Sequence, residues 1–253
     1  MAPCWVMTMS DYFGSLYLRF WGPKLEAVAE REVADILGIY EVYAGSKPQR
    51  VFDLGAGWGR HMIVFHSKGI EPWGIEKEEV FVRHFRETAP EEIKDHLILG
   101  DITQWQVPDD MKGTFDLALS LFSSIGWSDD TKVFQRAYDI LKPGGIFIVD
   151  TDNRDAYVIK PPSRTWQKVE GGIALDKHRI NWKDSILITK REIHANDGNI
   201  YTLNRQMRLY SLHEIVAMAQ QAGLTFLGAF GDLHMGGWSI RAGRNVVVLK
   251  KEG

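Results

Sequence analysis

Short apolar runs alternate with helical patterns through the middle of the chain, as they do in a parallel sheet with crossover helices. A helical pattern follows the first of these runs, and another begins at Asp129. The second ends at Leu141-Lys-Pro-Gly-Gly145, a sequence of the type that stops a helix. We predict strands at Val51–Leu54, Trp73–Glu76, His96–Ile102 (with its exit), Phe115–Ser120 and Ile146–Val149.

The period changes to two between residues 165 and 210, which predicts strands. Three groups of turn residues divide this stretch, so we expect an antiparallel sheet of about three to four strands inserted at residues 160–210. Ser211 and Glu214 form a capping box that opens the last helix, which ends at Gly223 before strands at 224–230 and 245–249. Near the start, residues 12–21 are rich in aromatic side chains, and Gly22-Pro23 is predicted to open the first helix.

The stretch Val51-Phe-Asp-Leu-Gly-Ala-Gly-Trp-Gly-Arg-His61 joins a buried strand to a helix through a glycine turn. Glycine permits positive φ and the close approach of a ligand. The free N–H groups and positive dipole end of the helix attract anionic or polar ligand groups. The spacing G-x-G-x-G, with Asp53 two residues before the first glycine, differs from the dinucleotide fingerprint G-x-G-x-x-G. The turn consists of Gly55, Ala56, Gly57 and Gly59 with Trp58 between the last two.

Two further carboxylates close predicted strands. Glu76 ends the second strand roughly 20 residues beyond the glycine turn, where an acidic residue meets ribose hydroxyls in nucleotide-binding α/β folds. Asp101 follows Gly100 at the exit of the third strand. The alternatives are a solvated charge at Glu76 and a helix N-cap at Asp101. The order Asp53, Glu76, Asp101, each closing a strand, favours a ligand-binding role.

Composition narrows the class of protein. The chain has 253 residues, a net charge of −3 and one cysteine, Cys4. The length suits one large domain or one domain with an insertion, and the charge gives no basic footprint for nucleic acid. A single cysteine excludes an intramolecular disulfide and a cysteine-based zinc site, and we predict no metal site. Residues 1–10 lack the features of a signal peptide and no apolar run is long enough to span a bilayer, so we expect a cytoplasmic location and no membrane partner.

The motif around Asp53, with Glu76 and Asp101 after it, resembles class I S-adenosylmethionine (SAM)-dependent methyltransferases over about residues 50–149. The resemblance implies an α/β, Rossmann-like fold, with a mostly parallel seven-stranded sheet and helices on both faces, to which this chain adds an antiparallel β insertion. It also implies site residues. Asp53 and the glycine turn would hold the methionine end of SAM, and Glu76 with its neighbour Lys77 the ribose. The other cofactor contacts would be Gly100, Asp101 and Ile102 at the adenine, Leu121 beneath the cofactor, and Tyr12 and Tyr17 in an aromatic lid or, alternatively, in the core.

The acceptor side is less sharply marked. Phe122-Ser-Ser-Ile-Gly126 resembles small-molecule N-methyltransferases, notably those acting on nucleotide-linked amino sugars, but Trp127 stands where those enzymes often have a histidine. The Asn-Pro-Pro-Tyr type motif of adenine and glutamine N-methylation is absent. Each candidate also has a structural interpretation as a core aromatic, turn former, helix-start or surface residue. By position, the substrate candidates are Trp127, Asn153, Arg154 and Trp238, and the candidates for a general base are His61, Asp152 and His234.

We therefore expect a SAM-dependent methyltransferase that moves a methyl group to a nitrogen or oxygen atom of a small-molecule acceptor by in-line displacement, releasing S-adenosylhomocysteine. Residues 1–45 are predicted to form a lid and first helix, and residues 46–253 the SAM-binding domain. The insertion at 160–210 would be a wall over the crevice or a homodimer surface. The alternatives are a non-catalytic SAM-binding protein, an RNA methyltransferase, which no basic run supports, and an aminopropyl transferase, whose three consecutive glycines are missing.

Overall fold

A seven-stranded sheet forms the centre of the molecule, in the strand order β10-β11-β5-β4-β1-β2-β3. The computed structural model describes residues 12–127, 129–161 and 163–253, so Cys4 and the first 11 residues lie outside the described part. Strands β1 to β5 pair in parallel, and β11 runs antiparallel to both of its neighbours, as predicted. The strands are β1 (Arg50–Leu54), β2 (Glu71–Glu76), β3 (Leu97–Leu99), β4 (Phe115–Ser120), β5 (Leu141–Asp152), β10 (Leu224–Phe230) and β11 (Arg244–Lys251).

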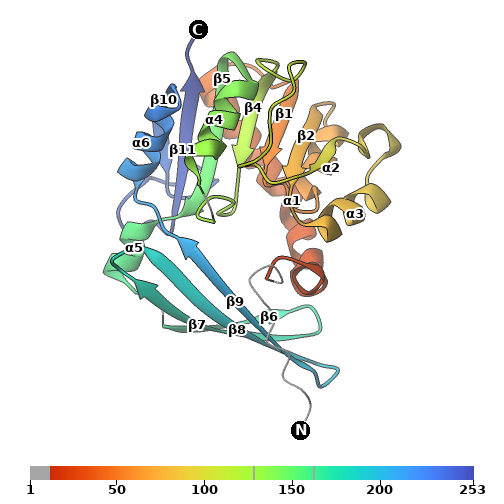
Figure 1. The fold of residues 1–253 in the computed structure, drawn as a ribbon, viewed down its shortest axis with the longest axis vertical. Helices are drawn as coiled ribbons and strands as arrows, with labels where there is room; N and C mark the ends of the chain where they lie inside the picture. The colour runs from red at the N-terminus through yellow and green to blue at the C-terminus, as the bar shows by residue number, and fades with distance from the viewer. Residues whose placement is uncertain (1–11, 128, 162) are drawn as a thin grey trace.

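Helices cover both faces of this sheet, because its strands are apolar on both sides (Figure 1). In β1, Phe52 and Leu54 pack into the core on the side of α4 and α6, whereas Val51 packs on the side of α1 and α2. The helices are α1 (Ser15–Ala44), α2 (Arg60–Ser67), α3 (Glu79–Thr88), α4 (Thr131–Ile140), α5 (Arg154–Ile159) and α6 (Leu212–Gln221), with a 3₁₀ turn η2 (Glu91–Ile93). The capping box of Ser211 and Glu214 is formed at the start of α6. The predicted fold class is confirmed.

Two predicted boundaries are wrong. The first helix begins at Ser15 and carries Pro23 in its interior, so Gly22-Pro23 does not open it. Proline removes one helical hydrogen bond, but Phe20 and Trp21 on the preceding turn are buried in the core, and that packing holds the turn in the helix. The second difference concerns the stop after α4. The helix ends as expected, yet Leu141 already pairs with Phe115 of β4, so β5 begins five residues before Ile146.

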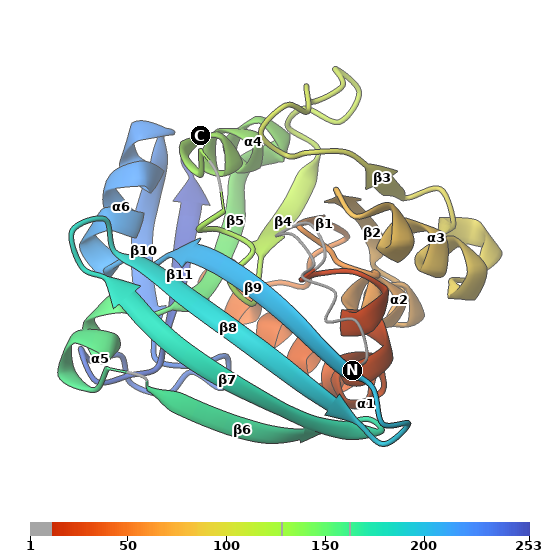
Figure 2. The same ribbon diagram turned by 60° about the horizontal axis from the view of Figure 1, so that its bottom comes forward.

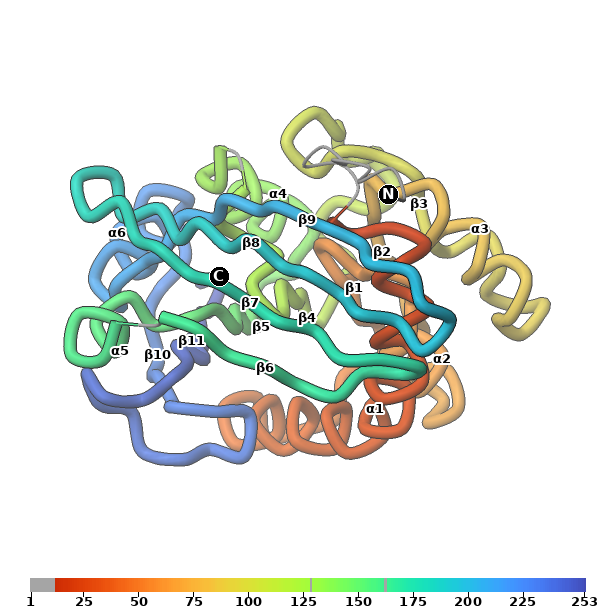
Figure 3. The backbone as a smooth tube through the Cα atoms, turned by 90° about the horizontal axis from the view of Figure 1, so that it is seen from below, coloured from red at the N-terminus to blue at the C-terminus, as the bar shows by residue number. Residues whose placement is uncertain are grey.

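A second, antiparallel sheet lies across the carboxyl ends of the parallel strands (Figures 1 and 2). Its hairpin turns occur where the sequence predicted them. The tube view shows its strands running over the central sheet towards the start of α1 (Figure 3). Its strands are β6 (Arg164–Val169), β7 (Gly172–Asn181), β8 (Ile186–Ala195) and β9 (Ile200–Arg208), in that order across the sheet.

Main-chain hydrogen bonds fasten this inserted sheet at two places. The Glu170 N–H donates to the Phe20 carbonyl in α1 (3.0 Å), and the Arg208 N–H donates to the Gly126 carbonyl after β4 (2.8 Å). Gly126 has φ of 103°, and a Cβ at this position would lie 2.5 Å from the Arg208 carbonyl oxygen, so only glycine fits here. Among the described residues, no helix combines the length and apolar character needed to cross a membrane.

Candidate functional site

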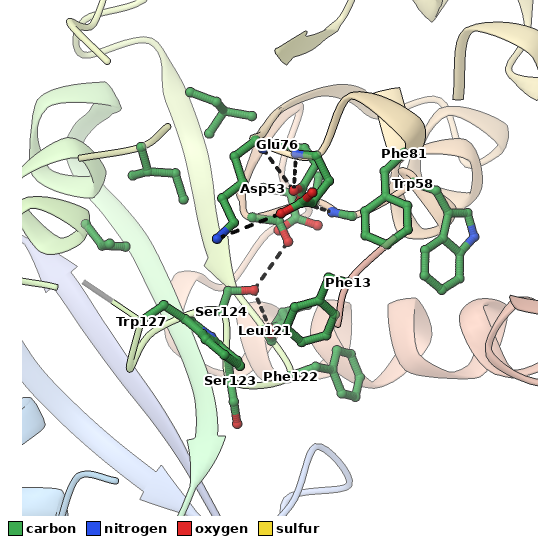
Figure 4. A pocket seen from close by; sticks show the side chains of 18 of the residues that line it. Phe13, Asp53, Trp58, Glu76, Phe81, Leu121, Phe122, Ser123, Ser124 and Trp127 are labelled. Atoms are coloured by element: carbon green, nitrogen blue, oxygen red, sulfur yellow. Dashed lines mark hydrogen bonds and ion pairs between the residues drawn. The ribbon is translucent and has the colours of Figure 1, made fainter. Parts of the chain in front are cut away.

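A cavity of about 360 Å³ opens at the carboxyl ends of β1, β2 and β4 (Figure 4). Its size is within the usual range for small-molecule sites, roughly 300–1,000 Å³. Four segments far apart in the sequence contribute to its walls: the start of α1, the glycine turn with the end of β2, residues 100–103 after β3, and the loop after β4. This is the edge at which ligands bind in open α/β sheets.

The glycine turn forms the floor of the cavity. Gly55, Gly57 and Gly59 all have positive φ, at 98°, 57° and 70°. The N–H groups of Gly55 and Ala56 donate to the Ile75 carbonyl of β2 (3.0 and 3.1 Å), which fixes the turn against the sheet. A Cβ on Gly57 would meet no atom within 4 Å, so this residue borders open space in the cavity. Gly59 is not part of the cavity wall, because it packs against the ring of Phe85.

Asp53 ends β1 beneath the turn and is buried with one carboxylate oxygen unpaired. Its Oδ1 is a buried atom without a hydrogen-bond partner in the structure, and its Oδ2 lies 3.9 Å from His61 Nδ1. Burial raises the pKa of Asp53 to about 7, the Arg60 charge opposes this rise, and the Glu76 charge adds to it. A buried acceptor without a donor is costly, so this atom is suited to receive a ligand's donor group.

Glu76 ends β2 beside Asp53 and is held in place by the backbone (Figure 4). Its Oε2 accepts from the Gly57 N–H, and its Oε1 accepts from the Lys77 and Glu78 N–H groups, all at 2.9 Å. Burial raises its pKa, and these three donors act against that rise. A carboxylate has about four acceptor positions, so about one remains for a ligand. Lys77 also lines the cavity.

Asp101 and its neighbours form the far wall. The Asp101 Oδ1 accepts from both the N–H and the hydroxyl of Thr103 (2.8 Å each), which is the N-cap type of contact that the sequence left open as an alternative. Gly100 and Ile102 line the cavity on either side of it. Asp101 is exposed, so its carboxylate is accessible from the cavity while it orders its own loop.

The loop after β4 carries strained backbone at the cavity wall. Phe122 and Ser123 both have positive φ (54° and 63°), which costs non-glycine residues about 1–3 kcal/mol each. Asp150 holds them, because its side chain accepts from the Phe122 N–H (3.1 Å) and its carbonyl accepts from the Ser123 N–H (2.9 Å). Leu121 and Ser124 line the cavity next to them. Strain of this kind is concentrated at functional sites.

Aromatic side chains close the cavity on the side of α1. Tyr17 lines it and stacks on Trp21 (ring centroids 5.4 Å apart), and Phe13 packs edge-on against both Tyr17 and Trp127 (5.2 Å each). Trp58 and Phe81 pack against each other (5.5 Å) and both contact Tyr17 edge-on, so they extend the same aromatic cluster (Figure 4). The aromatic stretch therefore divides: Phe13 and Tyr17 lie at the cavity, whereas Tyr12, Phe20 and Trp21 pack against the inserted sheet.

His61 connects this site to α1. Its Nε2 is 2.9 Å from Glu32 Oε2, which also pairs with Arg60, and its ring stacks on Phe122 (5.7 Å). Burial lowers the pKa of His61 to about 4, although the hydrogen bond to Glu32 acts in the opposite direction. Burial also raises the pKa of Glu32, but His61 and Arg60 outweigh it and lower that pKa overall. At neutral pH His61 is therefore uncharged.

Residues 51–145 match the methyltransferase domain family. The chain as a whole has the class I methyltransferase fold. The chain is similar to erythromycin 3''-O-methyltransferase of Saccharopolyspora erythraea, with 28% identity over 177 residues that cover 65% of this chain and 56% of that protein. The chain thus spans little more than half the length of that curated relative.

Solved structures of methyltransferases have the same fold. A SAM-dependent methyltransferase from Clostridium acetobutylicum superimposes with a TM-score of 0.75 at 15% identity, covering 94% of this chain and 97% of that one. A SAM-bound amino pentose methyltransferase from Micromonospora echinaspora, involved in calicheamicin biosynthesis, gives 0.70 at 16% identity, covering 95% and 98%. At these identities the likeness concerns the fold alone.

The cavity of the methyltransferase domain fits SAM. The unpaired Asp53 Oδ1 needs a donor, which an ammonium group provides. Gly57 leaves open space where a side chain would stand. Glu76 and Asp101 follow at the ends of the next strands, so acceptors are available along the length of a nucleoside.

Several residues suggested by sequence position lie outside the cavity wall. Asn153 is fully buried, donates to the Ala242 carbonyl (2.9 Å) and caps α5 by accepting from the Asp155 N–H (3.0 Å). Arg154 donates to the Ser185 hydroxyl (2.9 Å), and Trp238 donates to the Asn245 side chain (2.8 Å). These are structural contacts between α5, the inserted sheet and β11. Of the four substrate candidates, Trp127 reaches the cavity.

Two of the three candidates for a general base are also elsewhere. Asp152 accepts from Arg244 (2.8 Å), and His234 contacts Arg31 (2.9 Å) and Asp35 (2.8 Å) on the outer side of α1. His61 lines the cavity.

No sequence pattern predicted Trp58, Phe81, Phe122 or Phe13 as site residues, although three of them lie in stretches described above, and all four line the cavity. An aromatic residue inside a glycine turn is unusual enough to have been a signal for Trp58. The spacing of Phe81 on α3 is that of the core residues of this helix, so the sequence held no signal that it would line the cavity.

Proposed function

We propose that this chain transfers a methyl group from SAM to a nitrogen or oxygen atom of a small, sugar-type acceptor. The observation that carries the proposal is the cavity edge where Asp53, Glu76 and Asp101 succeed one another beside the glycine turn. Two of the three proteins named above support the acceptor class by their names, since one O-methylates erythromycin and the other, a structural neighbour, methylates an amino pentose.

The residues of the cavity have separate tasks in this proposal. Asp53 accepts from the ammonium group of SAM, the free position on Glu76 accepts from a ribose hydroxyl, and Asp101 accepts from the adenine amine. Ile102 and Leu121 pack on the apolar parts of the cofactor. SAM supplies a methyl group on a positively charged sulfur, so the enzyme's main work is to position the acceptor in line and keep water out. Phe13, Tyr17 and Trp127 supply the apolar cover.

His61 is proposed as a positioning residue. With a pKa of about 4, it takes up protons poorly at neutral pH, and both ring nitrogens face carboxylates, Glu32 at 2.9 Å and Asp53 at 3.9 Å. Its contacts keep α1 against the glycine turn. An amine acceptor that arrives uncharged needs no strong base, which agrees with this arrangement.

Binding of S-adenosylhomocysteine tests the cofactor site. Isothermal titration of the wild type should give a Kd in the micromolar range, or about −8 kcal/mol. Asp53→Asn and Glu76→Gln should each weaken binding about 10- to 100-fold, because each removes a charge-assisted hydrogen bond of about 1.5–3 kcal/mol. Glu71→Gln is the matched control, since it changes the same side chain at the opposite end of β2, where Glu71 pairs with Arg50. Folded wild-type protein that binds no S-adenosylhomocysteine would contradict the proposal.

Methyl transfer is tested with SAM labelled in the methyl group. The acceptor panel should contain matched pairs of sugars and glycosylated natural products that carry either a free amine or a hydroxyl at the same position. If the label is transferred to the amine compound of a pair but not to the hydroxyl compound, the acceptor atom is nitrogen, and the reverse result identifies oxygen. Tight cofactor binding without transfer to any acceptor would favour the non-catalytic alternative, and transfer to RNA instead would favour the RNA alternative.

A further inference from the structure

Polar side chains form a band across the middle of the inserted sheet, on the face turned towards the methyltransferase domain. Strand register places Thr165, Asp176 and Arg191 in one row and His178, Thr189 and Arg205 in the next. The rows on either side are mainly apolar, with Ala174 and Ile193 in one and Ile180, Leu187 and Met207 in the other. A sheet that served only as a cover would carry apolar residues along this whole face.

Most of the band is satisfied within itself. Arg191 binds Asp176 through two hydrogen bonds (2.7 and 2.8 Å), and both side chains are buried. The His178 ring lies between the Thr189 hydroxyl (3.0 Å) and the Thr165 hydroxyl (3.2 Å). Because these polar side chains are hydrogen-bonded to one another, their burial under the sheet costs little free energy.

Arg205 is the exception. Its Nε is a buried atom with no hydrogen-bond partner, and within the described residues no carboxylate pairs with its guanidinium. A guanidinium stays charged at any physiological pH, so the protein cannot relieve this burial by deprotonation. Arg205 as a whole is part-buried, and a charge that is partly withdrawn from water without an ion-pair partner costs free energy.

Tyr12 faces the same group. Its ring centroid lies 5.2 Å from the Arg205 guanidinium carbon and 5.0 Å from that of Arg191. The Tyr12 side chain is almost fully buried, and its hydroxyl also has no hydrogen-bond partner. Both of these unpaired groups can donate a hydrogen bond, since the Arg205 Nε–H is a donor only and the Tyr12 hydroxyl can donate as well as accept. A ligand that satisfies them must bring acceptor oxygens and negative charge.

This place adjoins the SAM cavity. Tyr12 packs against Phe13 (5.1 Å), which lines the cavity. Burial raises the pKa of Tyr17, another lining residue, and the Arg205 charge is among those that oppose the rise. Arg205 has the same opposing effect on Tyr157 of α5. Arg205 belongs to β9 of the inserted sheet, and its charge acts on side chains both at the cavity and on α5. The sheet itself covers the carboxyl ends of the parallel strands (Figure 2).

We propose that Arg205 and Tyr12 bind an oxyanion, a carboxylate or phosphate group, on the methyl acceptor. This inference rests on the proposed function, because it assigns the inserted sheet to acceptor recognition. The oxyanion accepts from the Arg205 guanidinium and the Tyr12 hydroxyl, and supplies the missing counter-ion. The part of the acceptor to be methylated then extends past Phe13 towards the loop after β4. Neutral acceptors of the same shape would bind less tightly.

Isothermal titration with inorganic phosphate and, separately, with acetate tests this subsite. Each titration is run with and without saturating S-adenosylhomocysteine, on the wild type and on Arg205→Gln, Arg205→Lys and Tyr12→Phe. At least one anion should bind the wild type, and the anion that binds more tightly shows whether the subsite takes a phosphate or a carboxylate group. Arg205→Gln should weaken that binding at least tenfold. Arg205→Lys should weaken it less, because it keeps the charge and loses the fork geometry. Tyr12→Phe should weaken it several-fold.

Arg179→Gln is the matched control, because Arg179 is an exposed arginine on the outer face of the same sheet. It should bind the anion as the wild type does. The same anion should raise the Tm of the wild type but not of Arg205→Gln, a readout that a merely structural role would not produce. Affinity of Arg205→Gln for S-adenosylhomocysteine should be unchanged.

The outcomes separate the two proposals. If neither anion binds the wild type, or if Arg205→Gln and Arg179→Gln bind it equally well, the subsite proposal is wrong whatever the cofactor does. If S-adenosylhomocysteine fails to bind, the proposed function is wrong, and the titrations without it still decide whether Arg205 forms an anion site.

Discussion

Asp53 should make cofactor binding depend on pH near neutrality. Its pKa is raised to about 7 by burial, against the Arg60 charge and with help from the Glu76 charge. His61, the titratable group on α2 that faces it, has a pKa of about 4 and stays uncharged above pH 6. Binding of an ammonium group beside Asp53 favours the ionised carboxylate. Free protein with protonated Asp53 must therefore lose a proton when the cofactor binds.

The size of the effect follows from the pKa. At pH 6 roughly a tenth of the free molecules carry an ionised Asp53, and at pH 7.5 roughly three quarters do, if the pKa is about 7. Affinity for S-adenosylhomocysteine should therefore rise about eightfold between these pH values, or ~1.2 kcal/mol. The ligand's α-ammonium group is that of a free amino acid, which is more basic than a peptide N-terminus (about 7.7–8.0), so it stays protonated over this range.

Isothermal titration at pH 6.0 and 7.5, in two buffers with different heats of ionisation, measures both the affinity and the protons released. Near pH 7 about half a proton should leave per ligand bound. Asp53→Asn should bind weakly at both pH values with no such rise, and Glu71→Gln should behave as the wild type. Equal pH dependence in the wild type and Asp53→Asn would refute the reasoning, as would an affinity that falls as the pH rises.

Two further predictions concern stability. The pKa of Asp53 is raised from 3.8 to about 7 in the folded protein, so the free energy of unfolding of the ligand-free wild type falls as the pH rises through this interval. Asp53→Asn has no such titration, so it should be more stable than the wild type at pH 8 by up to ~4 kcal/mol and close to it at pH 4. Urea denaturation at the two pH values measures the difference. Gly126→Ala should lose about 2–3 kcal/mol, because a Cβ there lies 2.5 Å from the Arg208 carbonyl oxygen at φ of 103°. Gly144→Ala is its control, since Gly144 also has positive φ (82°) but open space around it, and a loss as large as that of Gly126→Ala would contradict the clash argument.

Local signals predicted which residues at the ends of β1 and β2 meet at the cavity. Asp53 and Glu76 end strands whose apolar character is plain in the sequence, and parallel pairing of β1 with β2 brings strand ends to one edge. Glycine spacing then indicated the turn between them. The acceptor side depends on side-chain direction and on packing between distant segments. Asn153 and Trp238 are close in sequence to the right strands, yet both turn into hydrogen bonds that hold α5 and β11.

The start of α1 illustrates the same division. Local rules favour a helix that opens at Pro23, because proline removes a helical donor. The helix instead begins at Ser15, because Phe20 and Trp21 gain more from burial against the inserted sheet than one lost hydrogen bond costs. No local pattern contains that information, since the contact partners lie more than 150 residues away along the chain, at positions such as Tyr201.

Alone, the sequence determined the fold class, the order of the elements and the cofactor-binding edge, since these depend on periodicity, glycine placement and strand ends within short stretches. Tertiary structure decided which residues share the cavity. It brought Phe13 and Tyr17, at the start of α1, to the cavity of the glycine turn, left Asp53 Oδ1 without a partner, and left the Nε of Arg205 on β9 without a hydrogen-bond partner. Burial and the pairing of charges are properties of the assembled molecule, because they depend on which surfaces meet once the whole chain has folded.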